Sequence, residues 1–352
     1  MQILNKLLRT QKVYIFFTSF VLFIIIFSTT FLHANTFKVS NIEISSPFEH
    51  NFKKISVIDS GFQDSFLNLL SMIVKSSDRD KIKNINLKEL KAMIDSFTIS
   101  DEKFINNEYF AKLETSFNKK KILIFLEKKN IFPSVPLRNK VLLVPILVDA
   151  ETDGIYLFNK NIFYKKWNNE KKNYQLLEYF LPSEDLEDMN KIQEMSSSIE
   201  SYDFINLIKK YDIKDYIVSI IYKDKNEVKI LSKINLNNSL QINNQKYTQI
   251  NLDNEKDFQK ILENLKTTYE DYWKKNNEIN TSIKLPINVS VSSKNYKRII
   301  ELEEVFSNTD LISNFYILKF DSNNTQYKII YNGSPKTFFN VMSKNNFDLI
   351  ME

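Results

Sequence analysis

The first thirty-four residues pass from a basic start to a long apolar run. Three cations precede the run from Val13 to Phe27, three hydroxyl residues follow it, and the segment closes at Ala34. This order is typical of a secretory signal and predicts cleavage after Ala34. Residues 13–32 are also long enough to cross a hydrocarbon core of ~30 Å, so an uncleaved inner-membrane anchor is the alternative. Because the cations stay cytoplasmic, both interpretations place the remaining chain in the periplasm.

Residues 36–131 carry the pattern of a small unit of order βαββα. Apolar positions change from odd at 37 and 39 to even at 42 and 44, which predicts a strand with a bulge. Apolar residues at helical steps from Phe62 to Ile73 predict a helix, and alternation predicts strands at 96–99 and 106–117 with Asn106-Asn107 as the tip between them. A last helix carries Ile122, Phe125, Leu126 and Ile131, and we expect Pro133 and Pro136 to end it.

Residues 138–280 open with the unbroken apolar run Val141–Val148, which predicts a strand buried on both faces and covered by helices. Pro145 inside it predicts a bulge or a gap in the ladder. A helix stripe at 204–211 and strands at 216–222 and 228–234 follow, whereas the Asn- and Gln-rich residues 236–251 give no clear pattern. The strongest helix is predicted at 255–276, with an apolar face and a Lys- and Glu-rich face expected to lie in solvent.

Residues 284–352 predict the order βαββαβ of a ferredoxin-like unit. Strands are expected near 287–291, 316–320 and 327–331, a helix near 296–306, a short helix from Pro335, and a last strand at Phe347–Ile350. The predicted fold class is therefore α+β. It consists of three small α/β sandwich units, namely βαββα, an α/β layer and a ferredoxin-like unit, behind an N-terminal hydrophobic export segment of residues 1–34.

The composition excludes several kinds of chemistry. The chain has 3 Gly, no Cys and 2 His among 352 residues, so it lacks the material for a Gly-rich phosphate loop, a thiolate metal site or a disulfide. The formal net charge is +5, and the cations before the apolar run account for three of these charges. The remainder is close to neutral, so we expect no nucleic-acid partner. We also expect no cofactor. The three glycines are assigned to local structure: Gly61 before a helix, Gly154 in a turn, and Gly333 at a positive φ.

Three groups of residues are candidates for chemistry. His50 is the only imidazole after Ala34, and it is expected to be a surface residue rather than a base or a ligand. The acidic cluster Glu184, Asp185, Glu187 and Asp188 could form a hard-cation site or a carboxylate pair. The alternative is a helix start with Ser183 as cap and acids in the first turn, and this alternative is favoured.

An aromatic and basic group lies between the predicted strands at 141–148 and 216–222. It consists of Tyr156, Phe163, Tyr164, Lys165, Lys166 and Trp167. Such a group could stack on sugars, bases or peptides at a surface. The favoured alternative is a half-buried core with solvated lysines. We assign no catalytic, cofactor-binding or metal-binding residue from the sequence.

Several segments resemble a family of exported bacterial proteins, domain-of-unknown-function family 2066. The resemblance rests on the segments FKVSNIEI, FQDSFLNLLSMIV, FTISDEKFINNEYFAKLETSFNKKKILIFLEKKNI, VLLVPIL and NYKRIIELEEVFSNTDLISNFYILKFDSNNTQYKIIYNGS. The middle part, from VLLVPIL to YDIKDYIVSIIYKDKNEVKILSKINL, is also similar to the N-terminal α/β domain of the periplasmic translocation protein, but no β-propeller follows it here. The family has no established activity, so the resemblance implies export and no particular chemistry.

The first functional hypothesis is a non-enzymatic protein of the cell envelope that binds an envelope protein partner, with sheet edges as docking sites. The alternatives are a carboxylate-based enzyme or metal binder at residues 184–188, and a small-ligand carrier that uses the region around Trp167. Contact with the inner membrane is expected only through residues 13–32, if the segment is not cleaved.

Overall fold

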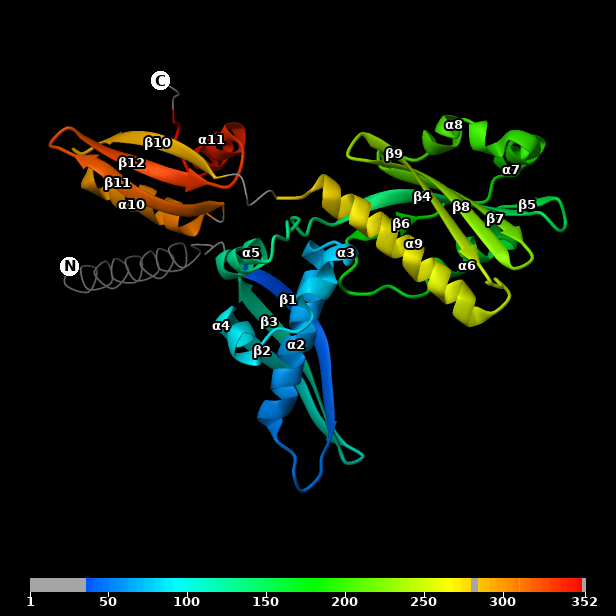
Figure 1. The fold of residues 1–352 in the computed structure, drawn as a ribbon, viewed down its shortest axis with the longest axis horizontal. Helices are drawn as coiled ribbons and strands as arrows, with labels where there is room; N and C mark the ends of the chain where they lie inside the picture. The colour runs from blue at the N-terminus through cyan, green and yellow to red at the C-terminus, as the bar shows by residue number, and fades with distance from the viewer. Residues whose placement is uncertain (1–35, 280–283, 310, 350–352) are drawn as a thin grey trace, which may run out of the picture. The chain divides into compact units, whose positions relative to one another are not determined.

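The computed structural model describes residues 36–279, 284–309 and 311–349. These residues form a mixed α+β structure with three sheets (Figure 1). The predicted export segment, including the cleavage point at Ala34, lies outside the described residues. Within the described ranges, no helix combines the length and the hydrophobicity that a membrane crossing requires.

The first sheet has three antiparallel strands in the order β1-β3-β2. Its elements are β1 (Thr36–Pro47), α2 (Lys54–Ile73), α3 (Ser76–Arg79), η1 (Asp80–Ile82), α4 (Leu87–Ala92), β2 (Ile94–Ile105), β3 (Glu108–Asn118) and α5 (Lys119–Lys128). The register shift between Val39 and Ile42 is the predicted bulge, and Asn41 takes a φ of 59° there. The alternating apolar residues of β1 and β3 pack against α2 and α5.

Two predictions in this region need correction. α5 ends at Lys128 rather than at the prolines, because Asn130 adopts a left-handed φ of 55° and the chain turns there. Gly61 lies inside α2 instead of before a helix. A Cβ at this position would come within 2.7 Å of Ile44 and 2.8 Å of Leu113, so the missing side chain lets the helix approach the sheet closely.

The middle sheet has six strands: five follow the order β5-β4-β7-β8-β9, and the sixth, β6, pairs with β4. Its elements are β4 (Asn139–Asp149), β5 (Gly154–Tyr156), η2 (Phe158–Lys160), α6 (Ile162–Lys166), β6 (Leu177–Phe180), α7 (Leu186–Glu194), η3 (Ser196–Ser201), α8 (Ile205–Ile208), β7 (Tyr216–Asp224), β8 (Glu227–Leu236), β9 (Ser239–Thr248) and α9 (Glu255–Asn276). Alternate residues of β4 enter two separate cores, one with α9 and one with α8. The prediction of a strand buried on both faces is therefore confirmed.

Pro145 occupies a gap in the ladder, as predicted. On one side β4 pairs with β6 only up to Leu142 and with β5 only from Leu147, so Pro145 needs no strand partner there. The predicted helix stripe at 204–211 shortens to the four residues of α8. The polar residues that gave no pattern form β9, which pairs with β8 over its whole length.

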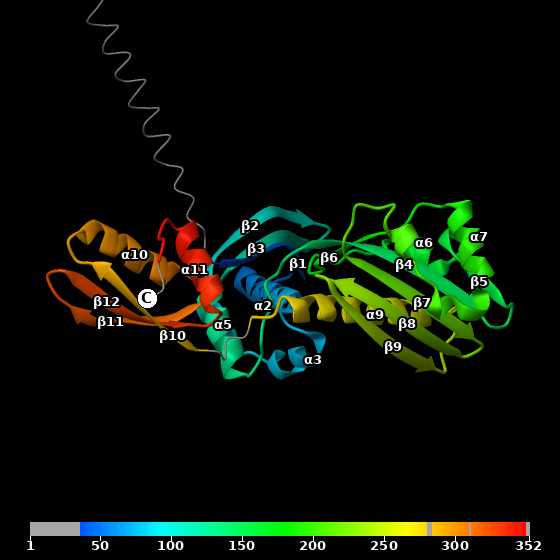
Figure 2. The same ribbon diagram turned by 90° about the horizontal axis from the view of Figure 1, so that it is seen from above.

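The third sheet has the antiparallel order β10-β12-β11 (Figure 2). Its elements are β10 (Leu285–Ser292), α10 (Tyr296–Asn308), β11 (Ile312–Phe320), β12 (Asn324–Tyr331) and α11 (Pro335–Lys344). Phe306 of α10 and Phe338 of α11 contact Tyr327 and Tyr331, so both helices pack on one face of the sheet. The last strand predicted from Phe347 is wrong for residues 347–349, which are not in a strand, and Ile350 lies outside the described residues.

The first and third sheets have the same topology. Apart from the short helices α3, η1 and α4, each sheet and its helices follow the element order βαββα. In both sheets the strand that comes third in the sequence, β3 or β12, lies between the other two. The second strand, β2 or β11, is consequently at an edge of its sheet in both cases. This is the strand order of a split βαβ unit without its fourth strand.

Asparagine takes many of the turn positions that glycine usually fills. Twelve non-glycine residues in the described ranges have a positive φ, seven of them Asn, and no glycine there has one. The two tip residues Asn106 and Asn107 have φ values of 50° and 58°, which supports the predicted hairpin. The assignment of a positive φ to Gly333 is wrong.

Candidate functional site

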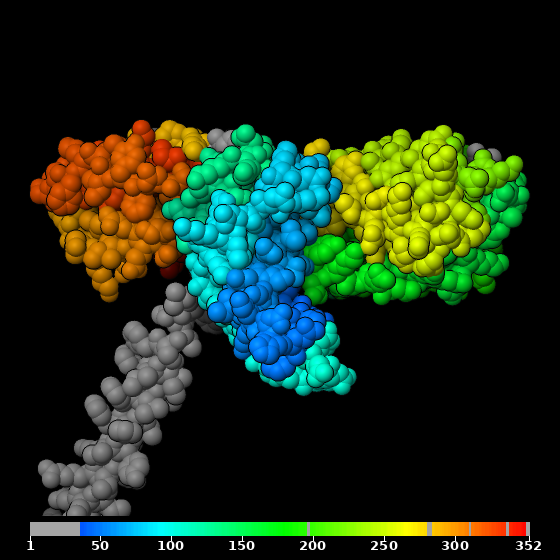
Figure 3. Space-filling model, turned by 60° about the horizontal axis from the view of Figure 1, so that its bottom comes forward, coloured from blue at the N-terminus to red at the C-terminus, as the bar shows by residue number. Residues whose placement is uncertain are grey.

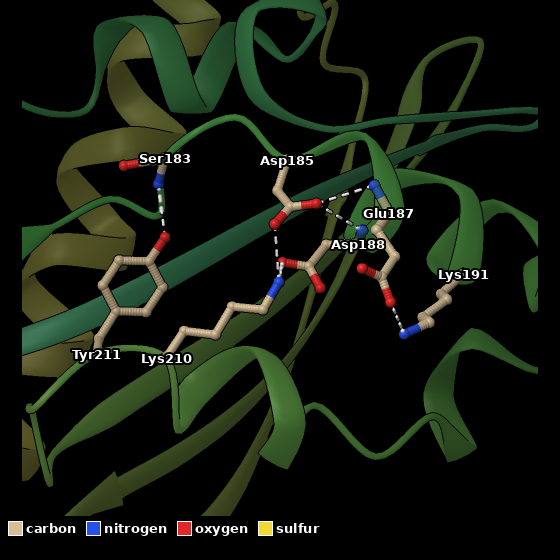
Figure 4. Close-up of polar contacts among 7 residues, drawn as sticks. All are labelled: Ser183, Asp185, Glu187, Asp188, Lys191, Lys210 and Tyr211. Carbon is tan, nitrogen blue, oxygen red and sulfur yellow. Dashed lines mark hydrogen bonds and ion pairs between the residues drawn. The ribbon is translucent and has the colours of Figure 1, made fainter.

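The acidic cluster is built around the start of α7. Asp185, rather than Ser183, is the N-cap, because its carboxylate accepts the backbone N–H groups of Glu187 and Asp188 at 2.9 and 3.2 Å (Figure 4). The backbone N–H of Ser183 instead donates to the hydroxyl of Tyr211 at 2.7 Å. The predicted helix start is correct in kind, but the cap is two residues later.

Lys210 neutralises the two aspartates of this cluster. Its ammonium lies 2.8 Å from Asp185 and 2.7 Å from Asp188 (Figure 4), and Glu187 pairs with Lys191 on the next turn. The hydrogen bond from Lys210 lowers the pKa of Asp185 and raises that of Lys210. In the described part of the chain, no group of three or more His, Cys, Asp and Glu side chains is arranged to hold a metal ion.

The aromatic group around Trp167 belongs to the core of the middle sheet. Phe163 and Trp167 are fully buried, and the Trp167 ring stacks on Tyr269 of α9 at 6.0 Å between centroids. Tyr164 donates its hydroxyl to the carbonyl of Pro182 at 2.8 Å. The favoured alternative of a core is thus correct for Phe163 and Trp167, and the surface interpretation is wrong for them. His50 is exposed in a turn, as expected.

The edge strand β11 carries the most exposed apolar residues in the third sheet. Leu318 is 50% and Phe320 70% exposed, and Tyr316 and Ile317 are similarly open. One edge of β11 pairs with β12, and no strand in the described residues pairs with the other edge. Its main-chain N–H and C=O groups on that edge are therefore available to a further strand.

Two exposed residues of α10 lie at the same end of the sheet. Ser292, the last residue of β10, is paired with Asn324, and Phe320 is paired with the adjacent Thr325. α10 begins four residues after Ser292, so its exposed Tyr296 and Ile300 belong to the end where β11 finishes. We call the exposed β11 residues Tyr316, Ile317, Leu318 and Phe320 the β11 patch. Register shifts at Ser313 and Leu318 form bulges in β11. At the end of this strand, Lys319 forms an ion pair with Asp321 at 3.3 Å.

The polar face of α9 contains buried charges that the sequence pattern did not indicate. Its outer surface is visible in Figure 3, yet Lys266, Glu270 and Lys274 are only 7%, 5% and 2% exposed. They recur every four residues and so lie on one stripe of the helix. The expectation that the Lys- and Glu-rich face lies in solvent is wrong for this stripe.

Each residue of the stripe is bound to main chain outside α9. Oε1 of Glu270 accepts the N–H groups of Leu176 and Leu177 at 2.9 and 2.8 Å, where β6 begins. Lys266 donates to the carbonyl of Glu170 at 3.0 Å, and its ammonium lies 6.0 Å from the centroid of the Trp167 ring. Burial raises the pKa of Glu270 and lowers that of Lys266.

Lys274 is the most buried charge of the stripe. Its ammonium donates to the carbonyl of Val74 at 3.3 Å and lies 3.9 Å from Asp271. Burial, reinforced by the nearby Arg79, lowers the pKa of Lys274 to about 8. Only the presence of Lys and Glu at four-residue spacing could have pointed to this stripe from the sequence, and that spacing is equally common on exposed helices.

No protein-family model matches the chain, and no match is found among curated proteins. The resemblance to exported proteins of unknown function therefore stays a prediction.

Proposed function

We propose that the chain is an exported, non-enzymatic binding protein of the cell envelope, and that β11 accepts an extended segment of a partner protein as an added strand. The observation that carries the proposal is the β11 patch, in which an unpaired strand edge coincides with exposed apolar side chains. Strand addition is a recurrent mode of peptide recognition: main-chain hydrogen bonds give affinity, and alternate side chains give specificity.

The chemistry of this edge defines the partner segment. An extended segment satisfies the main-chain groups of β11, and apolar side chains at alternate positions cover Ile317 and Phe320. A second copy of β11 is a poorer occupant, because the bulges at Ser313 and Leu318 leave only a short regular stretch for pairing between two identical edges. The partner is therefore proposed to be a different protein.

The proposal includes three units, each built on one sheet, behind an export segment at residues 1–34. The basic and apolar order of that segment and the resemblance to exported proteins support a periplasmic location. The shared topology of the first and third sheets supports related units at the two ends of the body. Sequencing the N-terminus of the mature protein tests export directly: we expect Asn35 if the segment is cleaved and Met1 if it is an anchor.

A photo-crosslinking amino acid placed at Leu318 in intact cells tests strand addition. We expect one crosslinked partner, which is lost when Phe320→Lys is added. The matched control carries the crosslinker at Leu240, which is 61% exposed on the edge strand β9 of another sheet. Equal capture from both positions, or no capture from Leu318, would contradict the proposal. A crosslink between two copies of the chain would show that β11 mediates self-association, and would contradict the proposal of a different partner protein.

A further inference from the structure

A cavity of ≈ 100 Å³ lies beside the buried stripe of α9. It is lined by Lys266, Glu270 and Lys274 of the stripe, by Arg79 of α3, and by Lys172 and Glu263. One water molecule occupies ~30 Å³ of the liquid, so this cavity has room for a molecule of a few non-hydrogen atoms. Several charged side chains line it, so an occupant without polar groups would leave them unpaired.

Two buried polar atoms of the lining residues have no hydrogen-bond partner within the described residues. One is Oε2 of Glu270, whose other oxygen accepts two backbone N–H groups. The other is Nε of Arg79, whose Nη1 makes a long hydrogen bond of 3.5 Å to Ser71. Buried polar groups are nearly always paired, so this acceptor and this donor indicate an occupant with a matching donor and acceptor.

The charge of the lining residues indicates the charge of the ligand that fits the cavity. Lys172 pairs with Glu263 at 2.7 Å, and Lys166 pairs with Glu255 at 2.5 Å. Of the remaining charged residues, Arg79, Lys266 and Lys274 are cations, whereas Glu170 and Glu270 are anions. Among these remaining lining residues the cations thus exceed the anions by one, while Asp271, outside the lining, lies 3.9 Å from Lys274 and offsets part of this excess. The remaining positive charge favours a ligand with one negative charge.

We infer that this cavity binds a small hydroxycarboxylate. The carboxylate accepts hydrogen bonds from Arg79 and from the ammonium groups of the stripe, and the hydroxyl donates to Oε2 of Glu270. This site is independent of the β11 patch, since none of its lining residues belongs to the third sheet. It is a binding site for a small anion on a chain whose proposed partner binds elsewhere.

Isothermal titration calorimetry of the purified protein tests the ligand class. Glycolate is the probe, acetate lacks the hydroxyl, glycine is the zwitterion and inorganic phosphate is an unrelated anion. We expect glycolate to bind at least tenfold more tightly than the other three, as one hydrogen bond to a charged group provides. No heat with glycolate overturns the inference. Phosphate binding as tight as glycolate binding overturns it in favour of a general anion site.

Paired variants locate the site. Lys274→Met should weaken glycolate binding by roughly ten- to a hundredfold, while Lys275→Met, its exposed neighbour, should leave the affinity unchanged. Arg79→Gln is the second variant in case Lys274→Met fails to fold. Equal affinity in Lys274→Met and Lys275→Met, or in Arg79→Gln and the unaltered protein, places the ligand elsewhere and overturns the inference.

A charge-neutral change separates the role of Glu270 from a general electrostatic effect. Glu270→Gln keeps an oxygen for the N–H groups of Leu176 and Leu177 and turns the amide NH2 toward the cavity. The acceptor of the ligand hydroxyl then becomes a donor, so glycolate should lose its advantage over acetate. Retention of the glycolate preference in a folded Glu270→Gln protein contradicts the assigned role of Oε2.

Discussion

The ammonium of Lys274 on α9 donates a hydrogen bond of 3.3 Å to the carbonyl of Val74, the residue that follows α2. The last carbonyls of a helix have no partner within it, and a cation near them is favoured by the helix dipole. This contact therefore offsets part of the desolvation that the buried ammonium suffers. It also joins two helices that are about two hundred residues apart in the sequence.

The first prediction concerns alkaline pH. Burial lowers the pKa of Lys274 from 10.5 to about 8 in the folded protein, which corresponds to roughly 3 kcal/mol. Between these pH values the unfolded chain holds the proton and the folded chain does not, so the free energy of unfolding should rise with pH there. Below about pH 8 Lys274 is charged in the folded state as well, so the full desolvation penalty of its ammonium lowers the free energy of unfolding. Arg79, Glu270 and Asp271 are the charged groups that face this ammonium.

Urea unfolding at pH 7 to 10.5 measures this effect. The difference in unfolding free energy between the unaltered protein and Lys274→Met should change by up to roughly 3 kcal/mol over the range. The Lys275→Met control should follow the unaltered protein. A difference that stays constant with pH would show that Lys274 keeps an ordinary affinity for protons.

The second prediction concerns Gly61 in α2. An alanine inside a helix normally stabilises it by about 1 kcal/mol relative to glycine. Here the new Cβ would meet Ile44 and Leu113 at less than 3 Å, so Gly61→Ala should destabilise the protein by ~1–3 kcal/mol. Ser60→Ala, at an exposed position of the same helix, should change stability by less than about 0.5 kcal/mol. Stabilisation by Gly61→Ala would mean that the helix does not approach the sheet this closely.

The third prediction concerns the cap of α7. Asp185→Ala removes the acceptor of two backbone N–H groups and one partner of Lys210, so the melting temperature should fall. Because Lys210 lowers the pKa of Asp185, this contribution is present above pH 3.8 and is lost as the pH falls through the lower folded value. Thermal melts at pH 7 and pH 2 should therefore show the difference only at pH 7. Glu187→Gln, which removes only an exposed pair, is the control.

The fourth prediction concerns the β11 patch in the absence of a partner. An exposed apolar edge strand promotes association, so the double variant Leu318→Lys, Phe320→Lys should scatter less light at high protein concentration. Both side chains are at least half exposed, so the unfolding free energy should change by less than about 0.5 kcal/mol. The control is the double variant Leu240→Lys, Ile242→Lys on β9. An equal fall in light scattering in this variant would contradict a special role of β11 in association.

The fifth prediction separates core from surface at Trp167. The side chain is fully buried and stacks on Tyr269, so Trp167→Ala should destabilise the protein by about 3–5 kcal/mol. Phe180→Ala, at an aromatic residue that is 41% exposed, should have a much smaller effect. Similar unfolding midpoints for the two variants in guanidinium would contradict the placement of Trp167 in the core.

The sequence pattern predicted those elements whose apolar residues are buried. The helix at 255–276 is predicted by its strong apolar period, and the strand at 141–148 by its unbroken apolar run. β9 was missed because its half-buried positions, such as Asn243 and Gln245, are polar and bond to Tyr272 and Thr268 of α9, while Leu240 and Ile242 face outward. Its hydrophobic pattern is therefore the reverse of the usual one.

The candidate sites were harder to predict for a related reason. A helix pattern distinguishes an apolar face from a polar one, but it does not tell what lies opposite the polar face. Glu270 and Lys274 are buried because β6 and the end of α2 bring main-chain groups to them, and those contacts join segments nearly one hundred and two hundred residues away. The cap of α7 was placed two residues early because Ser183 and Asp185 are both good capping residues.

The turns built from asparagine bear on the unfolded chain as much as on the folded one. Glycine explores more backbone conformations than any other residue, so a chain with only 3 of them in 352 loses less conformational entropy when it folds. The left-handed conformation of a residue such as Asn107 carries some strain in return. Replacing it by glycine relieves that strain but enlarges the unfolded ensemble, and these two effects oppose each other. Part of the stability of this protein thus resides in the restriction of its denatured state.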